Sequence, residues 1–202
     1  MKNLILAVCF ISIIQNSFSQ SIKGIGFRGG ANISKLTNAN LDSKTNAYFG
    51  MLYQVRLSNI YALQPELGYS NQGGKTKDSD NLYVEYLTLG FTNKLFLSPE
   101  TGFYMLVAPS FDFDIDDTFF GFLNRNDEDG NDVTFIDFSL SFGLGIEFKN
   151  GLAIEARYKQ GLIDVYSGSF HNFESELYES KNQFNSVFQI GLTYTFLLTK
   201  KE

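Results

Sequence analysis

The chain has 202 residues and a formal net charge of −6, with 21 Phe, 11 Tyr and 18 Gly but only 3 Pro and 1 Cys. This length fits one domain, and the aromatic content favours β-sheet, because aromatic side chains suit a pleated, half-buried surface. Nucleic acid is not an expected partner, since an acidic chain without a basic stripe cannot neutralise phosphates.

The amino-terminal segment has the order of a secretory signal. Lys2 is followed by an apolar run, Leu4 to Ile14, and then by the small-residue stretch that ends at Ser19. We predict a signal peptide over residues 1–19, because this apolar run is shorter than the roughly 20 residues that a spanning helix needs. Cleavage would also remove Cys9, so that neither a disulfide nor a thiolate site is expected in the mature chain.

Residues 20–202 are predicted to form one barrel domain, and the run from Thr134 to Phe148 is its clearest strand. Apolar side chains alternate there with polar or small ones, which is the period of a strand with one apolar face. The apolar set is Ile136, Phe138, Leu140, Phe142, Leu144, Ile146 and Phe148.

Seven further runs alternate in a similar way. They are Ile22 to Ile33, Asn46 to Leu57, Ile60 to Asn71, Leu82 to Leu97, Gly102 to Phe113, Leu152 to Asp164 and Phe184 to Leu198. After residue 20 no stretch is apolar enough to be a spanning helix, so a membrane protein of this sequence must cross as a closed barrel. The predicted fold is therefore all-β, an eight-stranded antiparallel up-and-down transmembrane β-barrel.

The connections between these runs alternate in length. The short ones are Ser58 to Asn59, Ser98 to Thr101 and Lys149 to Gly151, and the long ones are Ser34 to Thr45, Gln72 to Asn81, Asp114 to Val133 and Val165 to Gln183. Short periplasmic turns and longer extracellular loops distinguish the two rims of bacterial outer-membrane barrels. The last run, with aromatic residues to Phe196, is also typical of the signal that barrel assembly machinery recognises.

Charged residues within the runs fall opposite the apolar face of their own strand. They are Arg28, Arg56, Glu66, Lys94, Asp112, Asp137, Glu147, Glu155, Arg157 and Lys159, and Glu85 is the clearest exception. Five cations and five anions can pair inside a barrel that is only just wide enough for side chains to fill it. Within this set we interpret Arg28, Arg56 and Arg157 with Glu66, Glu147 and Glu155 as a structural ion-pair plug, in preference to a catalytic carboxylate pair or a pore lining.

The loops offer two weaker candidates. The run from Asp114 to Val133 is acidic and could hold Ca²⁺, but aligning Gly130 with the glycine of an EF-hand puts Arg125 at the first ligand position. His171 could form a triad with Ser167 or Ser169 and Glu174, although spacing in a loop gives no orientation. We therefore assign no catalytic, metal or cofactor residue, and expect no enzyme activity and no cofactor.

Four segments together resemble the PorT-like outer-membrane β-barrel family of Bacteroidetes-type bacteria. They are GFRGGANISKL at Gly26 to Leu36, ALQPELGYSNQGGK at Ala62 to Lys75, SFGLGIEF at Ser141 to Phe148 and IEARYKQGLIDV at Ile154 to Val165. The resemblance covers nearly all of the mature chain. It implies an outer-membrane location and, through the family's named member, a link to a secretion and gliding apparatus.

The expected function is a structural or interaction role in the bacterial outer membrane, exercised through the extracellular loops. The expected surroundings are outer-membrane lipid and lipopolysaccharide, with an envelope protein as a possible further partner. Three alternatives remain open at this point: a small membrane-embedded enzyme, a narrow channel, and a soluble barrel with a ligand in an apolar interior.

Overall fold

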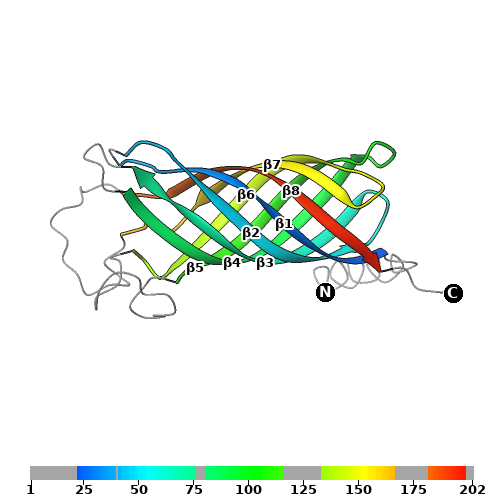
Figure 1. The fold of residues 1–202 in the computed structure, drawn as a ribbon, viewed down its shortest axis with the longest axis horizontal. Helices are drawn as coiled ribbons and strands as arrows, with labels where there is room; N and C mark the ends of the chain where they lie inside the picture. The colour runs from blue at the N-terminus through cyan, green and yellow to red at the C-terminus, as the bar shows by residue number, and fades with distance from the viewer. Residues whose placement is uncertain (1–21, 40, 76–80, 116–132, 167–181, 199–202) are drawn as a thin grey trace, which may run out of the picture.

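The computed structural model describes residues 22–39, 41–75, 81–115, 133–166 and 182–198 (Figure 1). The predicted signal peptide lies outside these residues. The described ranges form eight strands, and among them there is no helix long and apolar enough to span a membrane. The strands are β1 (Ile22–Leu36), β2 (Lys44–Arg56), β3 (Tyr61–Lys75), β4 (Asn81–Ser98), β5 (Phe103–Asp114), β6 (Ile136–Glu147), β7 (Leu152–Gly161) and β8 (Asn185–Leu198).

The strands close into one barrel in chain order. Each strand pairs antiparallel with its sequence neighbours, and β8 returns to β1, where Ile25 lies opposite Phe196. Closure leaves no strand edge with unpaired backbone groups. The predicted eight-stranded up-and-down barrel is confirmed.

The two ends of the barrel differ in their connections (Figure 1). Residues 57–60, 99–102 and 148–151 connect strands at one end, called here the turn end, where β1 also starts and β8 finishes. Gly102 and Gly151 have φ angles of +74° and +86°, a conformation that side chains rarely adopt. Strands β1, β3, β5 and β7 finish, and β2, β4, β6 and β8 start, at the opposite end, called here the loop end.

Strands β1 and β3 continue farther toward the loop end than the sequence pattern predicts. The predicted loops from Ser34 and from Gln72 begin within these strands, and both side chains are buried inside the barrel. Polar residues such as these are common in loops but also suit an inward position. The ends predicted from the sequence pattern for these two strands were therefore too early.

The prolines within strands are accommodated by local breaks in pairing. The β2–β3 register is interrupted beside Pro65, and the β4–β5 register is interrupted beside Pro109. Proline has no backbone N–H to donate to its neighbour. Beside the second break, the Asn93 side-chain amide donates to the Phe91 carbonyl at 3.0 Å and to the Val107 carbonyl at 3.2 Å, which supplies donors where the backbone ladder does not.

Alternate residues point to opposite sides of the wall. The outward set is apolar and about half exposed, as for Phe27 at 54 % on β1 and Leu192 at 54 % on β8. This arrangement rules out the soluble-barrel alternative, which requires the apolar face to point inward.

Glu85 shares the outward phase but is only 7 % exposed, and it accepts a hydrogen bond from the Asn71 amide at 3.2 Å. A polar neighbour therefore shields the clearest exception in the predicted pattern.

Candidate functional site in the barrel interior

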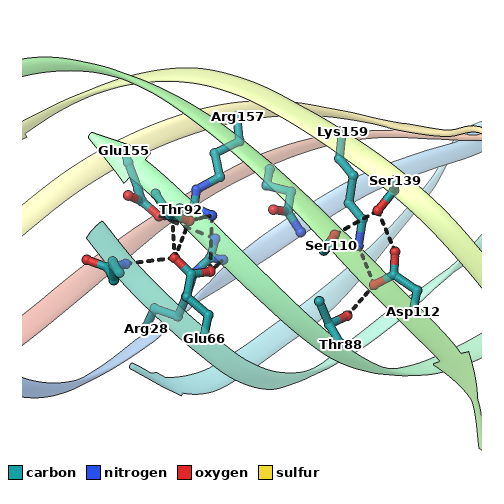
Figure 2. A network of polar contacts seen from close by, with 12 residues as sticks. Arg28, Glu66, Thr88, Thr92, Ser110, Asp112, Ser139, Glu155, Arg157 and Lys159 are labelled. Atoms are coloured by element: carbon teal, nitrogen blue, oxygen red, sulfur yellow. Dashed lines mark hydrogen bonds and ion pairs between the residues drawn. The ribbon is translucent and has the colours of Figure 1, made fainter. Parts of the chain in front are cut away.

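The inward-pointing charges form the most distinctive group of side chains in the described part of the chain. The ten that the sequence pattern picked out come from β1 to β7: nine gather in three groups along the barrel, and Asp137 lies apart from them. Figure 2 shows two of these groups, one around Glu66 and one around Asp112.

The central cluster consists of Arg28, Glu66, Glu155 and Arg157. Arg157 contacts Glu66 at 2.9 Å and Glu155 at 2.8 Å, while Arg28 pairs with Glu66 and lies 3.3 Å from Glu155. All four side chains are at most 10 % exposed. Two guanidinium groups and two carboxylates make the cluster formally neutral, so that their mutual attraction offsets part of the desolvation cost of burying the charges.

This cluster spans the barrel from wall to wall. Glu66 belongs to β3 and Arg157 to β7, which stand four strands apart in a closed ring of eight and so face each other. Glu66 also accepts hydrogen bonds from Thr92 at 2.6 Å and Gln64 at 2.7 Å. Carboxylate acceptors with several donors hold their position, so the cluster forms a fixed crossbar through the interior.

A second cluster lies toward the turn end. Glu147 on β6 contacts the Lys94 ammonium at 3.3 Å and the Arg56 guanidinium at 3.5 Å. Lys94 is fully buried and also donates to the Gln54 side-chain oxygen at 2.9 Å. The Arg56 guanidinium lies 3.9 Å from the centre of the Phe96 ring, a cation–π distance. Charges from β2, β4 and β6 therefore meet in a second layer.

A third cluster lies on the loop side of the crossbar. The Lys159 ammonium contacts Asp112 at 2.7 Å, and Asp112 accepts hydrogen bonds from Ser139 at 2.6 Å and Thr88 at 2.5 Å. Ser139 also shares a hydrogen bond of 2.8 Å with Ser110. Both carboxylate oxygens of Asp112 thus accept hydrogen bonds. Figure 2 shows Thr88, Ser139 and Lys159, each from a different strand, pointing toward Asp112.

Asp137 does not join these groups. Its carboxylate accepts hydrogen bonds from the backbone amides of Leu162 at 3.2 Å and Ile163 at 3.1 Å, just beyond the end of β7. The sequence pattern placed Asp137 among the ion-paired residues, whereas the structure places it where the chain leaves the barrel wall. It anchors that departure by satisfying two backbone donors.

Two buried apolar clusters lie in the interior, one toward each end of the barrel, and sequence reasoning missed them. At the loop end Leu36, Val84, Tyr86, Val133 and Val165 form a buried cluster. At the turn end Phe96, Tyr104 and Leu106 pack together with Ala62 and Ala108. The members on β4 and β5 are apolar residues that alternate with the outward apolar face of the same strand, and this pattern could have identified them from the sequence.

The open space beside the central cluster is small. A cavity of about 40 Å³ lies beside the central cluster, lined by Arg28, Glu66 and Arg157 together with Ser110 and other side chains. That volume is large enough for ordered water, which needs roughly 10–15 Å³, but too small for a metabolite. Gly145 contributes to the tight fit, since an added Cβ would lie 2.4 Å from the Tyr104 ring.

The loop candidates receive no structural test. The acidic residues 116–132 and the triad candidates around His171 lie outside the described residues. Within the described ranges, no group of three or more His, Cys, Asp or Glu side chains is placed to hold a metal ion. The candidate site that the structure does describe is therefore the packed, ion-paired interior.

An antiparallel barrel with an apolar exterior and a polar interior defines the class of outer-membrane β-barrels. The chain belongs to the family described as "Outer membrane protein beta-barrel domain", whose model matches residues 18–167. It is accordingly a protein of the bacterial outer membrane. In proteins of this class the short turns face the periplasm and the longer loops face outside.

Several solved structures have a similar shape. Neisserial surface protein A has 7 % sequence identity and a TM-score of 0.48, with 86 % of this chain and 97 % of that chain covered. Ail of Yersinia pestis has 13 % identity and a TM-score of 0.46, with 88 % and 100 % covered. The amino-terminal barrel of Pseudomonas aeruginosa OprF has 12 % identity and a TM-score of 0.45, with 88 % and 100 % covered. A search of curated proteins finds no match to this chain.

Proposed function

We propose that this chain is a non-conducting, non-enzymatic outer-membrane barrel that supports extracellular loops in contact with a protein, a glycan or lipopolysaccharide. The observation that carries the proposal is the crossbar formed by Arg28, Glu66, Glu155 and Arg157. A formally neutral, ion-paired cluster between opposite walls suits a rigid support better than a path for solutes.

The layers on either side of the crossbar support the same conclusion. The Lys94 and Lys159 ammonium groups are paired with carboxylates, and a buried apolar cluster lies toward each end. A pore lining needs exposed charge along open volume, and a catalytic carboxylate pair needs room for a substrate. The cavity of about 40 Å³ beside the crossbar supplies neither.

Conductance across planar bilayers tests whether the barrel is sealed. We expect no unitary current steps from the native protein. Replacing both Glu66 and Arg157 by alanine removes the ion pair between β3 and β7 and should produce small unitary current steps. The matched control changes an exposed pair at the turn end, Glu100→Ala with Lys149→Ala, and should stay silent. Regular ohmic steps from the native protein would contradict the proposal.

The finer part of the proposal concerns the partner. Resemblance to the PorT-like family supports membership of that group in Bacteroidetes-type bacteria and a link to a secretion apparatus. A photo-crosslinking side chain at Asn38, exposed at the loop end, should then trap one reproducible envelope protein in intact cells. The same side chain at Lys149, exposed at the turn end, is the control. Equal products from both positions, or lipid alone from Asn38, would argue against a protein partner.

A further inference from the structure

A groove lies on the outer wall near the loop end, separate from the interior clusters. Its volume is about 460 Å³, and its lining comes from β1, β7, β8 and residues 41–43. Ile33, Tyr158 and Phe188 form an apolar floor, and each is exposed on the side of the wall that faces lipid. The three residues are neighbours across the sheet, because Phe188 pairs with Tyr158 on one side and with Ile33 on the other.

Polar groups lie immediately beyond this floor, toward the loop end. Lys35 and Ser186 face each other across β1 and β8, and the Lys35 side chain is exposed. The Ser186 hydroxyl is 2.9 Å from the Tyr158 hydroxyl, which donates to the Gln160 side-chain oxygen at 2.8 Å. These hydroxyls are engaged with each other, so the Lys35 ammonium is the charged donor that the groove offers to a ligand.

Residues 41–43 form the remaining wall. Asp42 is held in place by two backbone hydrogen bonds to Lys75, each of 2.9 Å. Its side chain is exposed in the same groove. The Asp42 carboxylate repels anions, which confines an anionic group to the side of the groove where Lys35 lies.

We propose that this groove binds one phosphorylated glycolipid of the outer leaflet, of the lipid A type. An acyl chain would lie on Ile33, Tyr158 and Phe188, and a glucosamine phosphate would pair with the Lys35 ammonium. The position selects this occupant. The groove opens toward the membrane at the rim where the apolar wall gives way to polar side chains, so what fills it must be apolar on one side and anionic on the other. This inference rests on the outer-membrane location and not on the proposed role of the loops.

The test uses the full-length protein in nanodiscs that contain phosphatidylethanolamine and lipid A, with retained lipid counted by native mass spectrometry. We expect one retained bisphosphorylated lipid A per chain and weak retention of enzymatically dephosphorylated lipid A. Lys35→Gln should lower retention of the bisphosphorylated form about fivefold, the factor that corresponds to about 1 kcal/mol for one cation near a lipid surface.

The matched control is Lys23→Gln, which removes the same charge from an exposed position on the same strand at the turn end. It should leave retention unchanged. An equal loss in both variants, or equal retention of the dephosphorylated lipid, would overturn the proposal. If the native protein conducts current, or if Asn38 traps no protein partner, while lipid retention is as expected, the proposed function is contradicted and this lipid site is not.

Discussion

Removing one carboxylate of the crossbar should destabilise the protein strongly, because two buried guanidinium groups are then left with a single carboxylate. In Glu66→Met, Arg28 and Arg157 would share Glu155 alone. Breaking a buried ion pair by removing one partner costs about 3–5 kcal/mol, whereas replacing both partners by apolar side chains of similar volume is often close to neutral. Glu66→Met and Arg157→Met should each lower the free energy of unfolding by about 3–5 kcal/mol.

The double variant separates pairing from packing. Glu66→Met with Arg157→Met leaves Arg28 paired with Glu155 at 3.3 Å and restores neutrality. Its loss should be smaller than the sum of the single losses by at least about 2 kcal/mol, a coupling within the range for residues in contact.

Urea unfolding of the protein in phospholipid vesicles measures these differences. Far-ultraviolet circular dichroism is the suitable probe, since the chain contains no Trp, and extrapolation to zero denaturant gives the free energy. Glu100→Gln, at an exposed turn position, is the control and should change stability by less than about 0.5 kcal/mol. Additive losses in the double variant, or a loss below about 1 kcal/mol for Glu66→Met, would refute the assignment of the cluster as a coupled crossbar.

The same unfolding assay tests two features of the wall. Asn93→Leu should cost about 1–3 kcal/mol, because the carbonyls of Phe91 and Val107 would lose the side-chain donor beside Pro109; a change no larger than that of Met105→Leu would show that this donor is dispensable. Leu192→Arg, on the outward face midway along β8, should cost about 2–4 kcal/mol, whereas Leu198→Arg, at the turn end of the same face, should cost about 0–1 kcal/mol. An equal loss in the free energy of unfolding for both variants would mean that Leu192 does not lie near the middle of the membrane.

Strand number, strand phase and membrane location follow from the sequence because each depends on neighbours along the chain. Alternation over Thr134 to Phe148 defines one apolar face without any knowledge of partners. A bilayer then requires the charged face to turn inward and the sheet to close, since backbone groups in hydrocarbon must all be paired. The loop-side ends of β1 and β3 escaped this reasoning, because inward polar residues such as Ser34 and Gln72 have the composition of a loop.

The partners of the buried charges depended on the tertiary structure. Glu66 and Arg157 are 91 residues apart and meet only because β8 pairs with β1 and places β3 opposite β7. Local spacing contains no information about that closure or about the stagger between strands. The sequence also grouped Asp137 with the ion pairs, although the pairing of β6 with β7 places its carboxylate beside the backbone amides just beyond β7. Without the pairing of β8 with β1, the sequence could not show that Ile33, Tyr158 and Phe188 share one groove.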